Sequence, residues 1–342
     1  MNIALITFKA NSGNDIYFEL LKKALLKYTK FYVKIFYLPI FLEKLPFLIP
    51  LYLKKFNLNK FDIIHTNAEY GHFFKIKNKK LFITLHHFVL DKEYQKYTSI
   101  MQKIFHRFWL LPNLRKSLYV ADKIIAVSKY TKKVVEEYFK LKNKIYVIYN
   151  GIDTTFFRPQ FIKKGYKTIR LFYAGNLSKR KGFDLLPKIM SQLGNDYKLF
   201  FTTGLKGKKN INLKLNENMF YLGKLNKYQL LKEYNKCDIF LFPTRLEGFC
   251  YVVAEAMACG KPVISTNCSS IPEIVKNNKN GFLCKLNDVD DFVKKINKLS
   301  NNKRLIYNMK KINFKKINNR FNLKHMVLKY YKEYCKILNG KV

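Results

Sequence analysis

The sequence is poor in acidic residues, with 23 Asp and Glu against 65 Lys and Arg, which gives a formal net charge of +42 over 342 residues. Such a charge is compatible with nucleic acid, anionic lipid headgroups or phosphorylated substrates as partners. The basic excess occurs in both halves of the chain and therefore picks out no single face. Since Asn, Ile, Tyr and Phe are also abundant, a general compositional bias explains the charge equally well.

Several other signals are missing. No run reaches about 18 uninterrupted apolar residues, so we expect no transmembrane helix. The first residues, MNIALITF, have no basic flank and no small-residue cleavage site, so they predict a buried strand and not a secretory signal. Without a C-x-x-C pair, a zinc finger, an RNP-like strand or a compact basic helix, we expect a cytoplasmic protein with free thiols and no nucleic-acid partner. The six cysteines are Cys237, Cys250, Cys259, Cys268, Cys284 and Cys335.

What is present is an alternation of short apolar runs with longer amphipathic segments, which predicts an α/β fold of parallel strands joined by right-handed crossovers. The pattern restarts after residue 159. We therefore expect two domains, 1–155 and 156–320, and a terminal helix at 321–342. The expected strands are 3–8, 31–38, 61–66, 80–87, 122–128, 144–150, 170–176, 197–204, 218–225, 237–244 and 261–266. The expected helices include 15–28, 183–194, 227–236 and 251–260.

Two glutamates stand eight positions apart in the segment LEGFCYVVAEAMACGKPVIST at 246–266. The strand–turn–helix pattern puts Glu247 in the turn and Glu255 further along the helix, roughly 10 to 12 Å away at about 1.5 Å of rise per residue. The unpaired amides at the start of this helix form a candidate anion site. They belong to Gly248, Phe249 and Cys250. A ligand with a central diphosphate and hydroxylated rings at both ends, such as a nucleotide-sugar, suits this layout. On spacing alone, a capped helix with one solvent-facing acid and one in a salt bridge is the alternative.

Several motifs together resemble those of a known family. EGFCYVVAEAMACGKPVIST resembles the E-x7-E block of glycosyltransferase family 4, YAGNLSKRKGFDLL (173–186) its phosphate-binding block, and YNGID (149–153) its interdomain segment. Blocks at 121–135 and 269–284 resemble others in the family's order. The resemblance implies the GT-B fold, with two Rossmann-like domains facing across a cleft and a C-terminal helix that crosses back to the first domain. It also implies a retaining, metal-independent transfer of a sugar from a nucleotide-sugar to a hydroxyl acceptor.

The resemblance also implies roles for single residues. Glu255 would hold the nucleotide ribose and Glu247 would contact the donor sugar, with the amides of 248–250 against the sugar and the diphosphate. Cys250 stands where the family usually has glycine. Its side chain either crowds the donor pocket and bears on sugar choice or is an inert small residue, and we prefer the second interpretation.

The segment NLSKRKGFD is a basic loop between an expected strand and an expected helix. Cations beside a diphosphate leaving group neutralise the charge that grows as the glycosidic bond breaks. Lys181 matches the lysine of the family pattern. Asn176 stands where the family has an arginine, so we expect Arg180 to compensate from the far side of the loop. A plain run of surface charge is the alternative.

Strand ends in the first domain supply further candidates. The family places a histidine near the donor sugar at the end of the strand at 80–87, and His86 is the better match, with His87 as the alternative. The glycine-rich first turn of the family is poorly matched, because Gly13 stands alone where two glycines are common. His65 and Asn67, at another strand end, are candidates for facing the acceptor.

The segment FYLPIFLEKLPFLIPLYLKKF at 36–56 combines apolar residues, three prolines and flanking lysines. The prolines argue against one continuous helix. An apolar, lysine-flanked element on a basic protein suits an anionic membrane surface, so peripheral attachment to the inner face of the cell membrane is one expectation. Core packing or an acceptor-side loop is the alternative.

The sequence thus predicts a hexosyltransferase of cell-surface polysaccharide, lipopolysaccharide or glycolipid assembly, with a carbohydrate or lipid-linked acceptor and no cofactor or metal. No Asp-x-Asp stands near a strand end, and DVDD (288–291) is expected to begin a helix. The resemblance suggests a same-face displacement assisted by the leaving phosphate. The rival predictions are a GT-B epimerase or phosphorylase-like enzyme and a binding-only protein, the latter suggested by Asn176. A nucleic-acid-binding protein accounts for the charge but not for the motifs.

Overall fold

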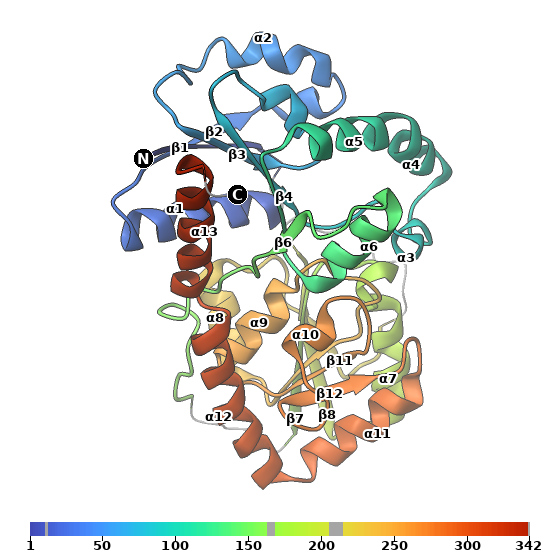
Figure 1. Cartoon of the computed structure of the whole chain (residues 1–342). Coiled ribbons are helices and arrows are strands. Elements are labelled where there is room, and N and C mark those ends of the chain that lie inside the picture. Colours follow the sequence, from blue (N-terminus) through green and yellow to red (C-terminus); the bar gives the residue numbers. More distant parts are fainter. Residues whose placement is uncertain (11–12, 163–167, 205–214, 341–342) are drawn as a thin grey trace. The chain divides into compact units, whose positions relative to one another are not determined.

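The structure is a computed structural model that describes residues 1–10, 13–162, 168–204 and 215–340. The chain divides into two compact units, a first unit of Met1–Gly151 with Leu323–Val342 and a second unit of Ile152–Asn322 (Figure 1). Each unit is built on one six-stranded sheet covered by helices. The predicted α/β class is confirmed.

The first unit has the strand order β2-β1-β3-β4-β5-β6, and all neighbouring strands are parallel. Strands β1 and β4 of this sheet are almost continuously apolar because both of their faces are buried. The strands are β1 (Asn2–Phe8), β2 (Tyr32–Leu38), β3 (Ile63–Asn67), β4 (Lys80–Leu85), β5 (Lys123–Ala126) and β6 (Ile145–Val147). The α-helices are α1 (Gly13–Tyr28), α2 (Ile49–Leu53), α3 (Lys92–Gln95), α4 (Ile100–Phe105), α5 (Leu111–Val120), α6 (Lys129–Phe139) and α13 (Leu323–Leu338).

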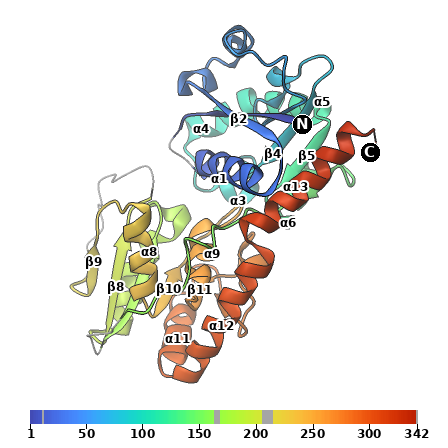
Figure 2. The same ribbon diagram turned by 90° about the vertical axis from the view of Figure 1, so that its left-hand side faces the viewer.

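The C-terminal helix α13 packs against α1 in the first unit (Figures 1 and 2). A buried polar network fixes this contact. The Tyr17 hydroxyl donates to the Tyr330 hydroxyl at 2.5 Å. The ring nitrogens of His65 bond the hydroxyls of Tyr334 at 2.6 Å and Thr84 at 2.7 Å. Because His65 is fully buried, with both nitrogens occupied and its pKa lowered to about 3 by desolvation, the prediction that it faces the acceptor is wrong.

The second unit has the strand order β12-β11-β10-β7-β8-β9, again all parallel. The strands are β7 (Ile169–Ala174), β8 (Tyr197–Thr202), β9 (Met219–Tyr221), β10 (Ile239–Phe242), β11 (Val263–Thr266) and β12 (Gly281–Cys284). The α-helices are α7 (Leu186–Leu193), α8 (Lys227–Lys236), α9 (Tyr251–Ala258), α10 (Ile271–Ile274), α11 (Val289–Ser300) and α12 (Lys303–Arg320). Helices α9 and α11 both pack against α12 (Figure 2).

Every strand that the sequence predicts is present, and β12 and α12 add to the predicted elements. Asp288 caps α11 through the amide of Asp291, so DVDD begins a helix as expected. The segment 36–56 is broken as its prolines predict. After β2 it forms two 3-10 turns, η1 (Ile40–Glu43) and η2 (Pro46–Leu48), and then α2.

Candidate active site

The predicted donor residues gather at one place in the second sheet. From the adjacent strands β7 and β10 the strand order runs outward in both directions, with β8 and β9 on one side and β11 and β12 on the other. This is a topological switch point, and in open α/β sheets ligands bind at such points, beyond the carboxyl ends of the strands. The loop after β7 holds residues 175–182, and the loop after β10 holds residues 243–250.

Backbone and side-chain contacts fasten these two loops together. Gly182 has φ +73°, and a Cβ on it would lie 1.8 Å from the carbonyl oxygen of Pro243, so only glycine fits. The Arg245 guanidinium binds both carboxylate oxygens of Asp184, at 2.6 and 2.9 Å. Arg245 was not among the predicted site residues, and its place two residues before Glu247 is the only local sign of its role. It is a positioning residue that holds one loop against the other.

Lys181 and Glu247, predicted separately, form an ion pair that joins the two loops. The Lys181 ammonium donates to the two carboxylate oxygens at 2.6 and 2.8 Å, and Glu247 is 5% exposed. The Thr244 hydroxyl donates to Glu247 Oε1 at 2.9 Å, and the Glu247 amide donates to the Ser269 hydroxyl at 2.8 Å. The carboxylate is thus held in one orientation before any ligand arrives. A phosphate or sugar hydroxyl at this point meets an oriented cation–carboxylate pair.

Arg180 and Asn176 lie at opposite ends of the loop after β7. The Arg180 guanidinium donates to the carbonyl of Leu246 at 2.9 Å, directly beside the Glu247 turn. Asn176 packs closely on Gly204. A Cβ added to Gly204 would lie 2.1 Å from the side-chain oxygen of Asn176. The loop therefore contains a cation at Arg180 and a close-packed amide at Asn176.

Glu255 lies on α9, on the helix that follows the Glu247 turn. Its carboxylate accepts a hydrogen bond from the Tyr234 hydroxyl at 2.9 Å, and desolvation raises its pKa to about 7. Cys250 occupies the N-cap position of α9 and makes no side-chain cap hydrogen bond. Its thiol is buried and its pKa is raised by desolvation, in keeping with an inert side chain. Phe249 is also buried, and Gly248 links it to Glu247.

The first sheet has its own switch point, between β1 and β3. Asn67 ends β3 and donates to the Thr7 hydroxyl of β1 at 3.3 Å, while its buried side-chain oxygen has no hydrogen-bond partner among the described residues. Glu69 follows, with its pKa raised to about 7 by burial and by the nearby Glu43. Glu69 was not among the predicted site residues, although an acid just after a buried strand was the available signal.

His86 follows β4, and its ring packs edge-on against Tyr17 at 4.6 Å between centroids. Desolvation is the largest cause that lowers its pKa to about 3, so the imidazole is neutral at pH 7. Its buried Nε2 has no hydrogen-bond partner in the described part of the chain. The ring of His87 instead packs on Tyr94. Gly13 begins α1, and a Cβ there would meet nothing within 4 Å, so packing alone does not require glycine.

All six cysteines are free thiols, as predicted. Within the described ranges, no group of three or more His, Cys, Asp or Glu side chains is arranged to hold a metal ion. None of the helices in that part of the chain is long and apolar enough to cross a bilayer.

Two family models match the chain, "Glycosyl transferases group 1" over residues 154–316 and "Glycosyltransferase Family 4" over residues 17–156. The chain therefore belongs to glycosyltransferase family 4. An uncharacterized glycosyltransferase of Methanocaldococcus jannaschii is 35% identical over 188 residues, which are 54% of this chain and 51% of the relative. The capsular polysaccharide biosynthesis glycosyltransferase CapM of Staphylococcus aureus is 29% identical over 60% of this chain and 59% of its own. The chain thus matches little more than half the length of these relatives.

Solved structures share the fold. A sucrose-phosphate synthase from Thermosynechococcus elongatus superposes with a TM-score of 0.84 at 17% identity, over 99% of this chain and 100% of its own. Anabaena HepE, solved in complex with UDP-glucose, superposes with a TM-score of 0.74 at 17% identity, over 98% and 99%. The fold of the chain is GT-B, as the resemblance implies.

Proposed function

We propose that this protein is a retaining hexosyltransferase that moves a sugar from a nucleotide-sugar donor to a hydroxyl acceptor without a metal or cofactor. The observation that carries the proposal is the cluster of side chains at the β7–β10 switch point, where Arg180, Lys181 and Glu247 gather just before α9. Cations and helix amides suit a diphosphate, and carboxylates suit sugar hydroxyls. The Anabaena relative solved with UDP-glucose supports a donor of this class.

Each residue has a defined task in this proposal. Glu255 accepts hydrogen bonds from the ribose, and Glu247 from the donor sugar. Lys181 and Arg180 neutralise the negative charge that grows on the leaving diphosphate. In a same-face displacement the bond from the anomeric carbon to the diphosphate oxygen breaks and the acceptor oxygen bonds to that carbon. The acceptor proton passes to the departing phosphate oxygen. His86, as a neutral imidazole, contacts the reacting sugar.

Donor binding is tested by thermal shift with UDP-, GDP-, ADP- and CMP-sugars on the wild type and on Glu255→Ala. Glu217→Ala, an exposed acid of the same unit, is the matched control. We expect one nucleotide to stabilise the wild type and the control and not the Glu255 variant. No response to any donor at low salt, with an intact fold, would refute the proposal. Donor binding without sugar transfer to any acceptor would favour the binding-only alternative that Asn176 suggests.

We further propose that the acceptor is a growing surface polysaccharide, lipopolysaccharide or glycolipid, and that the first unit rests on the inner face of the membrane. The similarity to CapM, a glycosyltransferase of capsular polysaccharide biosynthesis, supports the first part. The membrane proposal is supported by exposed apolar side chains that lie beside lysines, a combination typical of elements that bind a membrane surface. Those in η1, η2 and α2 are Ile40, Phe41, Leu45, Phe47 and Leu51. Those on α4 and the π-helix that follows it are Ile100, Met101, Ile104, Phe105, Phe108 and Trp109.

The membrane proposal is tested by co-sedimentation with vesicles that contain phosphatidylglycerol. Phe47→Ser with Leu51→Ser removes two side chains that are 58% and 59% exposed. Tyr228→Ser with Phe220→Ser, exposed in the second unit, is the control. We expect only the first pair to weaken vesicle binding. Equal binding by both variants would show that this segment does not touch the membrane.

A further inference from the structure

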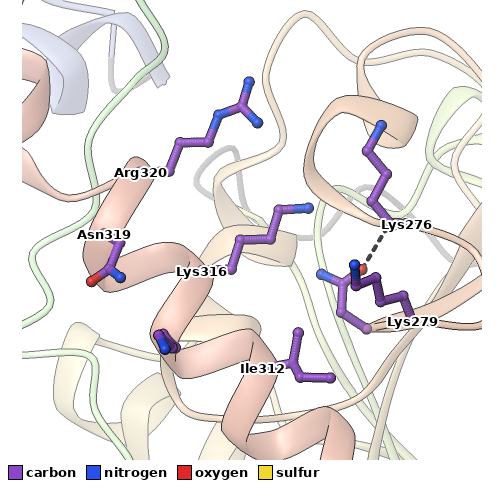
Figure 3. Close-up of a pocket in the computed structure, with 8 residues that line it drawn as sticks. Lys276, Lys279, Ile312, Lys316, Asn319 and Arg320 are labelled. Atoms are coloured by element: carbon purple, nitrogen blue, oxygen red, sulfur yellow. Dashed lines mark hydrogen bonds between the residues drawn. The ribbon is translucent and has the colours of Figure 1, made fainter.

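A hollow of about 410 Å³ lies in the second unit, between α12 and the loop that follows α10 (Figure 3). The residues that line it in the described part of the chain are Lys276, Lys279, Asn280, Ile312, Lys315, Lys316, Asn319 and Arg320. Five of these eight are cations and none is acidic. None of them belongs to the loops at the β7–β10 switch point, so the hollow is separate from the candidate active site.

The loop side of the hollow is a tight, hydrogen-bonded turn. The buried Asn280 side chain accepts from the amide of Lys276 at 2.5 Å, and the amide of Lys279 donates to the carbonyl of Lys276 at 3.1 Å. Asn278, at φ +61°, completes the turn. These contacts hold the two lysines of the loop opposite α12. The backbone positions of these two lysines are therefore fixed by the hydrogen bonds of the turn.

The helix side presents a row of residues at helical spacing. Ile312, Lys315, Lys316 and Asn319 stand three or four positions apart and so share one face of α12. Figure 3 shows Lys316 and Arg320 extending from α12 toward the loop that carries Lys276 and Lys279. Positive charges thus meet at one hollow from two separate elements.

Lys316 lies deepest among these cations. Its ammonium donates to the carbonyl of Ile274, which leaves two of its three N–H groups for other partners. Burial, followed by the charges of Lys276, Arg320 and Lys279, lowers its pKa to about 8. Like charges held this close repel one another, and an anion between them would remove that repulsion.

We propose that this hollow binds a phosphate-bearing anion with two or more negative charges. Lysine ammoniums are compact point charges that suit phosphate oxygens. The lining has no aromatic side chain on which a base would stack, so the phosphate groups and not a nucleoside are recognised. The volume falls in the usual range for a small-molecule site, about 300 to 1,000 Å³. The proposal stands independently of the proposed transferase activity.

The test is a calorimetric titration with inorganic diphosphate at low salt. Lys279→Gln with Lys316→Gln removes two cations from opposite sides of the hollow. Lys294→Gln with Lys303→Gln removes the same charge from exposed positions of α11 and α12 and is the control. A third variant, Lys181→Gln, weakens any binding of diphosphate at the candidate active site, so that binding at the two places can be told apart. We expect the hollow variant to bind one diphosphate about 100-fold more weakly while the control is unchanged, since each lost charge-assisted hydrogen bond contributes about 1.5 kcal/mol.

A second readout keeps the test independent of variants. In the wild type with 13C-labelled lysines, the pKa of Lys316, followed by NMR through its side-chain Cε, should rise when diphosphate is added. Vesicles with phosphatidic acid, compared with neutral vesicles, then tell whether the phosphate belongs to a lipid headgroup or to a soluble compound. Equal diphosphate affinity of the hollow variant and the control, or an unchanged Lys316 titration at saturating diphosphate, would overturn the proposal.

Discussion

Loss of Lys181 is expected to destabilise the second unit through Glu247. Lys181→Met leaves a 5% exposed carboxylate without its cation, and removing one partner of a buried ion pair costs about 3 to 5 kcal/mol. Because the Lys181 side chain is 17% exposed and Thr244 still donates to Glu247, we expect the lower end, about 3 kcal/mol. For a domain of this size that corresponds to a melting temperature lower by about 6 to 12 °C.

A double-mutant cycle isolates the ion pair. Lys181→Met, Glu247→Gln and the double variant are unfolded in urea with a probe in the second unit. We expect the double variant to be more stable than Lys181→Met alone, with a coupling energy of at least about 1 kcal/mol. The exposed pair Lys133–Glu137, 3.8 Å apart, is the control and should couple by less than about 0.5 kcal/mol. If the effects of Lys181 and Glu247 add within about 0.5 kcal/mol, the pair does not hold the turn.

Three further results are expected. Gly182→Ala should cost about 2 to 4 kcal/mol through its left-handed backbone and its clash, whereas Gly223→Ala, with φ +73° and open space, should cost about 1 kcal/mol; urea unfolding that ranks them equally would contradict the close-approach argument. The Glu255 pKa of about 7 must fall when ribose hydroxyls donate to its carboxylate, so donor binding should release protons near pH 7 and weaken as the pH falls below 7. Titration calorimetry in two buffers measures the proton release. The same release in Glu255→Gln would exclude Glu255 as its source. Tyr334→Phe leaves a buried nitrogen of His65 unpaired and should cost about 1 to 3 kcal/mol by urea unfolding, and an unchanged stability would show that water replaces the hydroxyl.

The fold follows from local patterns in the sequence. Strands such as β1 and β4 are buried on both faces, so their apolar runs are nearly continuous and easy to recognise. The prolines at 39, 46 and 50 likewise mark where the segment 36–56 breaks, because proline removes a helical hydrogen bond. Helix α12 is harder to recognise because Lys, Arg and Asn occupy most of its positions, and its buried face is narrow.

The candidate site was predicted residue by residue but not as a set of contacts. Glu247 and Lys181 were each assigned to a ligand, and the structure shows that they bind one another. Arg245 and Asp184 are 61 positions apart, and no local pattern indicates that their side chains meet. His65 lies near the end of the strand expected at 61–66, but in the structure it is the central residue of β3, and α13 supplies its partner from the other end of the chain. Contacts between distant segments are set by the packed fold, and local periodicity does not encode them.

The departure at Asn176 is consistent with this packing and need not mean a loss of activity. Its amide lies against Gly204, where even a Cβ would collide with the side-chain oxygen, so an arginine stem at 176 would have to leave that contact. Arg180 brings a guanidinium to the Leu246 carbonyl, next to the Glu247 turn, from the other end of the same loop. A cation therefore lies beside the Glu247 turn, although it comes from another position than in the family pattern. Because electrostatic stabilisation depends on where the charge lies and not on which backbone position supplies it, this arrangement favours a working transferase over a binding-only protein.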